Sequence, residues 1–224
     1  MKFGPAETAD LFRALESSAS AAGPVVGSYV GGQFEAYVRV VNPAVAGAGS
    51  ADQRRRSWGS LIDCSRSFDG STAQWAEIRD SMSDASDFDE PAMGRLEPAT
   101  ARALANLLSQ HTASPDECSF AWWIGYADVR VPAEAPRVFL PPGREMFVMQ
   151  GGVSDGADEH AGWGIGRTPL RWLPRDRAWS VGNDIYGRSV FVGGTDAAIS
   201  ELLEHPDLEA YVVSPETPVM PEDW

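Results

Sequence analysis

Hydrophobic positions recur at two spacings along this 224-residue chain, and the spacing predicts the elements. Apolar side chains three to four positions apart indicate amphipathic helices at 6–21, 71–82, 98–110 and 195–204. The helix at 98–110 has the clearest start, because Glu97 precedes it and Pro98 suits a first helical turn. Ser71 and Thr195 are the residue types that cap helix N-termini, so each is expected to begin a helix.

The second spacing is the alternation typical of β-strands, and it occurs in short runs. The segment FEAYVRVV at 34–41 alternates, with Phe34 and Val38 on one side and Tyr37 and Arg39 on the other, which predicts a half-buried strand. Further runs occur between Pro, Gly and Asp residues at 118–126, 137–141, 144–150, 177–181, 189–194 and 208–213. Their close spacing favours neighbouring antiparallel strands.

The order of these elements predicts an α+β fold: a mostly antiparallel sheet in the C-terminal half, packed by three to four helices. The chain shows no series of βαβ units and no repeat of fixed period. We expect one domain over residues 1–224. A two-lobed organisation, helix-rich at 1–115 and strand-rich at 116–214, stays open, and the Pro-rich tail at 215–224 is expected to fray.

The net charge of the chain limits the classes of partner that we expect. The chain has 32 acidic and 18 basic residues, for a net charge of −14, and 43% of its residues are hydrophobic. A negative field repels phosphate backbones and anionic lipid, so we expect neither nucleic acid nor a membrane surface as a partner. A basic protein fits the charge better, although acidity for solubility alone explains it too. No signal-like segment or membrane-length apolar run occurs, which favours a cytoplasmic protein.

Residues for catalysis or metal binding are few. Cys118 and His111 are the only thiol and imidazole near each other in sequence, but Cys118 opens an apolar strand, where an inert buried thiol is typical. The segment SDGADEH, ending at His160, offers oxygen ligands and one imidazole, yet its spacing does not match a calcium loop. A solvated acidic loop is the simpler interpretation. We therefore expect no metal and no cofactor.

Two other segments have residues typical of phosphate binding, but the sequence around each of them argues against that function. GWGIGR at 162–167 lacks a preceding strand, and Pro169 prevents a following helix. The basic cluster Arg54–Arg56 stands in an acidic chain. We expect it to pair with nearby acids, of which the candidates are Asp84, Asp87, Asp89 and Glu90.

Tryptophans and arginines supply the candidate binding residues. The chain has eight tryptophans, and exposed Trp near Arg is typical of binding hot spots, whereas a Trp-rich core is the alternative. Glycines and Asn-Asp turns explain much of the segment 172–194, but Asp184, Arg177 and Arg188 could cluster at one end of its hairpin. The candidate partner- or ligand-binding residues are Trp122, Trp123, Trp163, Trp172, Arg175, Arg177, Asp184 and Arg188.

Five segments together resemble a family of uncharacterised bacterial cytosolic proteins with no assigned activity: FEAYVRVVNPA, SWGSL, CSFAWWIGY, WLPRDRAWSVGNDI and VFVGGTDAAISELLEHPDLEAYVV. The resemblance runs across most of the chain and implies a shared architecture without a function. Asn42 stands where the family pattern has His, and NDIYGRSVF replaces a more acidic segment. If those polar positions form a site in relatives, part of it is missing in this chain.

These observations favour an acidic, non-enzymatic binding protein for a basic protein partner, by analogy with immunity proteins that neutralise toxins. An enzyme with a polar site near the 175–188 hairpin is the alternative, and it requires Asp184, Arg177 and either Cys118 or His111 to converge. A small-ligand carrier is the third possibility. Its expected sign is a pocket lined by Trp122, Phe147 and Trp179.

Overall fold

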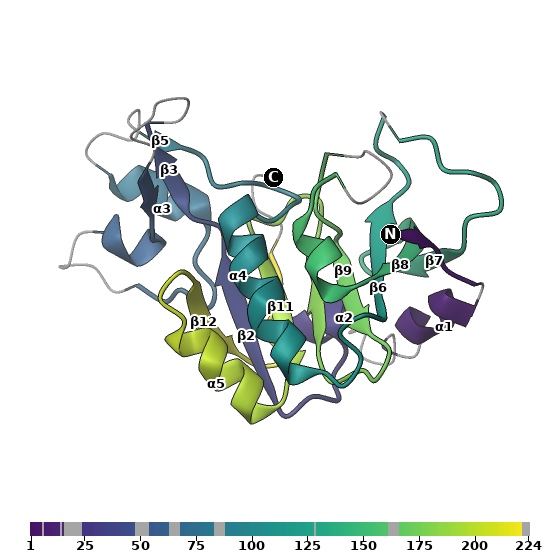
Figure 1. The fold of residues 1–224 in the computed structure, drawn as a ribbon. Coiled ribbons are helices and arrows are strands. Elements are labelled where there is room, and N and C mark those ends of the chain that lie inside the picture. The colour runs from purple at the N-terminus through teal and green to yellow at the C-terminus, as the bar shows by residue number, and fades with distance from the viewer. Residues whose placement is uncertain are drawn as a thin grey trace.

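The computed structural model describes residues 1–5, 7–13, 15, 24–47, 54–62, 68–82, 88–127, 129–160 and 166–220. Over these residues the fold is α+β, with five α-helices and a large antiparallel sheet of nine strands, which confirms the predicted class (Figure 1). The strands lie in the order β1 (Lys2–Phe3), β8 (Arg144–Gly151), β6 (Cys118–Trp123), β9 (Arg171–Pro174), β10 (Ser180–Gly182), β11 (Ser189–Gly194), β2 (Ala36–Val41) and β12 (Glu209–Val213), and β7 (Arg137–Leu140) pairs with β8.

The helices are α1 (Glu7–Arg13), α2 (Val26–Val30), α3 (Trp75–Ser81), α4 (Pro98–Leu108) and α5 (Asp196–Glu204), joined by the 3-10 turns Trp58–Ser60, Ser109–His111 and Val153–Ala157. A second, three-stranded sheet consists of β4 (Arg54–Arg56), β3 (Ala44–Ala46) and β5 (Phe88–Asp89). Strands from both predicted lobes share the large sheet, since β2 lies between β11 and β12 and β1 pairs with β8. The two-lobed division at residue 115 is therefore not the division that the sheet follows.

Helices α4 and α5 cover one face of this sheet, in front in Figure 1. Period-two alternation sends Val38 and Val40 of β2 into that layer, where Trp122, Trp172 and Trp179 are fully buried. Burying a large apolar side chain contributes about 1.5–3 kcal/mol, so this layer holds much of the stability.

The opposite face is covered by α1 and by α2, which lies behind the sheet in Figure 1. Tyr29 of α2 packs there with Tyr37 of β2 and Phe191 of β11. Both faces of β2 are thus covered, and its Arg39 is only 3% exposed. The prediction of a half-buried strand with Arg39 outward is wrong, because α2 and the segment around α3 pack on the side that the alternation left for solvent.

Three further expectations need correction. Helix α3 begins at Trp75 rather than after Ser71, whose hydroxyl instead donates to Asp69 at 2.6 Å. Strand β10 begins at Ser180, because the chain turns at Arg177, which has a φ of 55°. Residues 215–219 do not fray: their backbone exchanges hydrogen bonds of 2.8–3.0 Å with residues 24–27. Elements α2 and β9 were not predicted, and most of the predicted helix beyond residue 13 lies outside the described residues.

No helix in the described part of the chain is both long enough and apolar enough to cross a membrane.

Candidate functional site

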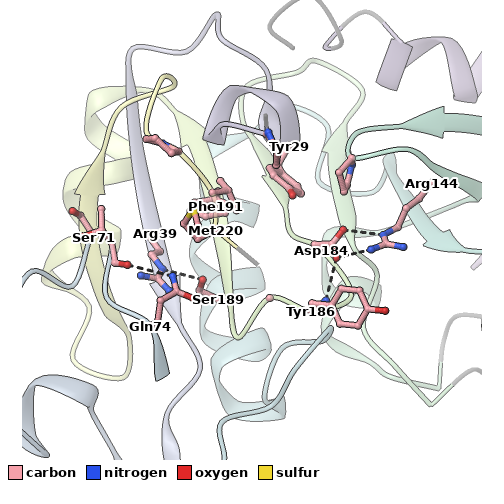
Figure 2. Close-up of a pocket in the computed structure, with 16 residues that line it drawn as sticks. Tyr29, Arg39, Ser71, Gln74, Arg144, Asp184, Tyr186, Ser189, Phe191 and Met220 are labelled. Atoms are coloured by element: carbon pink, nitrogen blue, oxygen red, sulfur yellow. Dashed lines mark hydrogen bonds and ion pairs between the residues drawn. The ribbon is translucent and has the colours of Figure 1, made fainter. Parts of the chain in front are cut away.

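A cavity of about 320 Å³ lies on the face of the large sheet that α2 covers (Figure 2). Its volume is at the lower end of the range for small-molecule sites. The apolar lining is contributed by Pro24, Tyr29, Pro142, Tyr186, Phe191, Pro218, Val219 and Met220, and the polar lining by Arg39, Ser71, Thr72, Gln74, Arg144, Asp184 and Ser189, with Gly187 between them.

Arg39 forms one end of the cavity. It lies in the middle of β2, and hydrogen bonds hold its side chain in place. Its Nε donates to Ser189 Oγ at 2.9 Å, and one terminal nitrogen donates to the carbonyl oxygens of Ala73 at 2.7 Å and Gly70 at 3.2 Å. The guanidinium also lies 5.4 Å from the centre of the Trp58 ring. Its charge is therefore fixed in position before any ligand arrives.

Tyr29 descends from α2 into the middle of the cavity, between Arg39 and the Arg144–Asp184 pair (Figure 2). Beneath its ring, at 4.8 Å, lies the guanidinium of Arg171, which is 2% exposed and donates to the carbonyl oxygens of Leu170, Pro141 and Asn183. Burial lowers the pKa of Arg171 to about 10 and raises the pKa of Tyr29 to about 12. Both groups thus keep their protons at neutral pH.

Arg144 and Asp184 form the other end. The two side chains make a bidentate ion pair, with nitrogen–oxygen distances of 2.8 and 2.9 Å. The Arg144 guanidinium lies between the rings of Trp123 at 5.2 Å and Tyr186 at 5.4 Å. Its pKa is raised, chiefly by the hydrogen bond to Asp184. Asp184 is thus occupied, and it is the sole carboxylate among the described lining residues.

Two hydroxyl donors in the cavity wall have no acceptor in the described part of the chain. Ser189 accepts a hydrogen bond from Arg39, which leaves its own proton unused. The Tyr29 hydroxyl has no hydrogen bond to a described residue, and its high pKa keeps it a donor. Around Tyr29, moreover, the two guanidinium groups of Arg144 and Arg171 face only the carboxylate of Asp184. The charged residues in the described lining are two arginines and one aspartate, a balance that favours an anion. The same wall also holds Gln74 Oε1, a buried acceptor without a described partner.

Helix α2 forms the roof of the cavity, and it is held there by a close backbone contact with the sheet and by the C-terminal segment. A Cβ atom on Gly182 of β10 would lie 2.4 Å from the carbonyl oxygen of Tyr29, so α2 rests directly on this glycine. From the other side, Val26 N donates to Thr217 O at 3.0 Å and Gly27 N donates to Pro215 O at 2.8 Å. These contacts place α2 over the sheet with a cavity beneath it.

The candidate tryptophans differ in how far their side chains are buried. Trp122 and Trp172 are fully buried, and their indole N–H groups donate to the carbonyl oxygens of Arg167 and Pro169. This position fits the alternative of a Trp-rich core, and neither ring is available to a partner. Trp123 is partly exposed beside Arg144. Trp163 lies outside the described residues.

The small-ligand pocket expected at Trp122, Phe147 and Trp179 is also not where the structure has a cavity. Trp122 stacks on Phe147 with ring centres 5.6 Å apart, and the Trp179 indole donates to Leu108 O at 2.9 Å. All three side chains are core residues on the face opposite the cavity.

The predicted cluster of Asp184, Arg177 and Arg188 does not form. Arg177 is in the turn between β9 and β10, at the opposite end of β10 from the other two residues. Asp184 pairs with Arg144, and Arg188 pairs with Glu90 at 2.6 Å. Arg175, a further candidate, makes an exposed ion pair with Glu117. Sequence proximity was misleading because the partners of each group come from distant segments.

The residues of the enzyme alternative do not converge, because Asp184 follows β10 and Arg177 precedes it. Cys118 is fully buried at the start of β6, and burial raises the pKa of its thiol well above the usual value. The imidazole Nε2 of His111 lies 3.1 Å from a carboxylate oxygen of Glu201 in α5. Cys64 lies outside the described residues. The described thiol therefore has the environment of a core residue.

Other polar motifs have structural partners. Asp155 accepts from Gly152 N and Asp158 accepts from His160 N, and the described residues contain no group of three or more potential metal ligands. Arg55 pairs with Glu97 at 3.2 Å, not with Asp89 or Glu90. Asp84, Asp87 and residues 162–165 lie outside the described part. Asn42 is buried, and its side chain bonds to the backbone of Ala92, Arg95 and Glu97.

Sequence reasoning missed Tyr29, Arg39, Arg144 and Ser189. The sequence held one signal, the arginine Arg39 within the otherwise apolar run YVRVV. In a strand that is covered on both faces, a buried charge must be hydrogen-bonded or paired, so such an arginine indicates a polar site. The other three residues carry no pattern that separates them from ordinary surface positions.

Comparisons with known proteins give no match to a family model, to a curated protein or to a solved structure. The family resemblance of the five sequence segments thus receives no support from them and stays a prediction.

Proposed function

We propose that this chain is a binding protein for a small anionic molecule, held in the cavity between α2 and the large sheet. The observation that carries the proposal is the pair of unmatched donors, Ser189 Oγ and Tyr29 Oη, in a wall that also contains Arg39 and Arg144. A bound anion would give both hydroxyls an acceptor within the cavity, and a hydrogen bond to a charged group contributes about 1.5–3 kcal/mol.

Binding is better supported than catalysis. The described lining residues include no His and no Cys. The hydroxyls of Ser71 and Thr72 donate to Asp69, an exposed carboxylate whose pKa is lowered, first by the hydrogen bond from Ser71, so that it is a weak base. Asp184 is held by Arg144 and is not placed to accept a proton from a substrate. A nucleophile beside a base whose pKa suits neutral pH is not assembled among these residues.

The test is a thermal-shift screen of small organic compounds with neutral, cationic and anionic members. At 100 times its Kd a ligand adds about 2.7 kcal/mol of stability. For a chain of this length that is a rise in Tm of roughly 5–10 °C. Val219→Trp adds a large ring to the cavity wall, and Val212→Trp adds the same ring at a position that is 65% exposed on β12.

Compounds that stabilise the wild type should also stabilise Val212→Trp and should not stabilise Val219→Trp. The proposal fails if no compound raises Tm, or if Val219→Trp responds as the wild type does.

A basic protein partner is a second candidate, favoured by one charge asymmetry. After Arg188 the chain has eight Asp and Glu residues and no Lys or Arg. Helix α5 exposes Asp196, Glu201 and Glu204, with Leu203 38% exposed beside them. Such a face suits electrostatic steering toward a cationic surface.

Charge neutralisation on α5 tests this candidate. A partner retained by the wild type at low salt should be lost with Asp196→Asn, Glu201→Gln and Glu204→Gln combined. Equal retention by the two proteins would remove α5 as the contact surface.

A further inference from the structure

We propose that the outer edge of β12 is a docking edge, where an extended basic segment of a partner protein pairs as an additional strand. This inference rests on the second candidate function, a basic protein partner, and adds the surface and the mode of binding. Three observations support it: the direction of the backbone groups of β12, the regularity of this edge, and the side chains that border it.

Strand register determines which backbone groups of β12 point outward. Directly after β2, Asn42 N donates at 2.9 Å to the carbonyl oxygen of the residue before β11. Because successive residues direct their N–H and C=O groups to alternate sides of a strand, Val41 has its groups on the side of β12, opposite Glu209. By the same alternation Ala210 and Val212 direct their N–H and C=O groups away from β2. Among the strands of the described residues, none pairs with that side of β12 (Figure 1).

The edge at β12 is longer and more regular than the opposite edge of the large sheet. Natural sheet edges are protected by short strands, by Lys or Pro, or by bulges. At the opposite edge two short strands pair with β8: β1 has two residues and contains Lys2, and β7 has four and begins with Arg137. Strand β12 has the sequence EAYVV and pairs with β2 at all five positions without a bulge. It is therefore a suitable template for the addition of a strand.

Two exposed apolar side chains lie on the α5 side of this edge. Val212 pairs with Val38, so its side chain is on the sheet face that α5 covers, and it is 65% exposed. In α5, Glu201 faces α4, because it lies 3.1 Å from His111 at the end of that helix. Leu203 is two positions, or about 200°, further around the helix, so it lies on the side away from α4 and toward the β12 edge. It is 38% exposed, and an added strand with apolar side chains on this face would lie beside both residues.

Charge selects a basic segment as the occupant. Four exposed carboxylates lie on α5 or on either side of β12 in the chain: Asp196, Glu204, Asp207 and Glu216. The chain has no Lys or Arg after Arg188. Arg55 and Arg56 of β4 line a hollow at the start of β12, and Arg55 is paired with Glu97. We therefore expect the basic side chains of the partner along α5 and the second half of β12. A second copy of this chain fits less well, because each copy has a net charge of −14.

Fluorescence anisotropy with synthetic strand peptides tests the proposal. The probe is a labelled peptide of eight residues that alternates lysine and valine. One control peptide replaces each lysine with glutamate. A second control is N-methylated at every residue, so it keeps the charge and side chains without N–H donors. We expect the lysine–valine peptide to bind at least tenfold more tightly than either control.

A pair of variants tests the backbone of the edge. Val212→Pro removes one outward N–H group and leaves the groups that bond to β2, and proline is tolerated at such positions of edge strands. It should weaken binding of the lysine–valine peptide at least tenfold. Val212→Thr is the matched control, because it keeps the N–H group and the branched side chain, and it should bind within threefold of the wild type. Hydrogen exchange on the wild type needs no variant: the peptide should slow exchange of the Ala210 and Val212 amides at least tenfold.

The outcomes separate this edge from its alternatives. Equal binding by Val212→Pro and the wild type, unchanged exchange of the two amides, or no binding of the lysine–valine peptide would each overturn the docking edge. Peptide binding that is lost only when Asp196, Glu201 and Glu204 are neutralised would overturn the edge and leave α5 as the contact surface. A wild-type dimer in sedimentation analysis that Val212→Pro dissociates would make the occupant a second copy and overturn the basic segment. The thermal-shift screen tests the cavity independently of all these results.

Discussion

Gly182 determines whether α2 can rest on the sheet, and Gly182→Ala is the most direct perturbation of the roof over the cavity. A Cβ atom at this position would lie 2.4 Å from the Tyr29 carbonyl oxygen and 2.9 Å from the carbonyl carbon. An ordinary contact needs about 1 Å more, and the obstacle is helix backbone rather than a flexible side chain. Overpacking of this kind costs roughly 1–3 kcal/mol.

Gly194→Ala in the adjacent strand is the matched control. A Cβ atom there would meet Trp179, Ala198 and Ile199 at 3.5–3.8 Å, which is ordinary van der Waals contact. Both substitutions restrict the unfolded chain equally, by about 0.4–1 kcal/mol, so the difference between them isolates the contact with α2.

The assay is urea unfolding followed by tryptophan fluorescence. We expect Gly182→Ala to lower the free energy of unfolding by about 1–3 kcal/mol and Gly194→Ala to leave it unchanged or slightly higher. Equal stability of the two variants would refute the close packing of α2 on β10, and with it the placement of Tyr29.

Three further outcomes follow from buried and paired groups. In a Cys64→Ser background, Cys118 should resist thiol reagents at pH 8 until the protein unfolds, because burial raises its pKa; rapid labelling of folded protein would contradict this. Tyr29 ionises near pH 12 when folded and near 10 when unfolded, so its own contribution to stability is complete below pH 10 and is lost between pH 10 and 12, by about 1.4 kcal/mol per unit, whereas Arg171, with its pKa lowered to about 10, contributes the opposite slope over the same range. Relative to the wild type, Tyr29→Phe should therefore make the change in stability per pH unit between pH 10 and 12 more positive by about 1.4 kcal/mol; an unchanged slope would argue against burial of the phenol. Glu209 accepts from two backbone N–H groups, at 2.6 and 2.8 Å, so Glu209→Gln should lower the free energy of unfolding by about 1–2 kcal/mol in urea titrations, and no change would show the contacts to be weak.

The elements predicted most accurately were those whose first residues mark a helix start in the sequence. The helix at α4 was predicted because Glu97 and Pro98 mark its start in sequence, and α5 because Thr195 does. In contrast, α2 has five residues and an apolar composition that suits a strand as well as a helix. It is helical because it rests on Gly182 and is held by the segment at 215–219, neither of which is close to it in sequence.

The site was less accessible to prediction for the same reason. Arg39 and Ser189 are 150 positions apart, and Tyr29 and Arg171 meet because α2 packs on the large sheet. The tryptophans drew attention because they are rare and large, but five of the six described ones are fully buried core residues: Trp58, Trp75, Trp122, Trp172 and Trp179. Asp184 was named as a candidate residue, but its partner is Arg144, which the fold brings from a distant segment of the chain.

A crystal structure of the protein grown with the anionic compound that raises Tm most in the thermal-shift screen tests the central claim, that a small anion binds in the cavity between α2 and the large sheet. We predict density for the ligand in the cavity, with an anionic oxygen within about 3.2 Å of Ser189 Oγ or Tyr29 Oη. An empty cavity at saturating ligand, or a ligand bound with its anionic group directed away from both hydroxyls, would contradict the account.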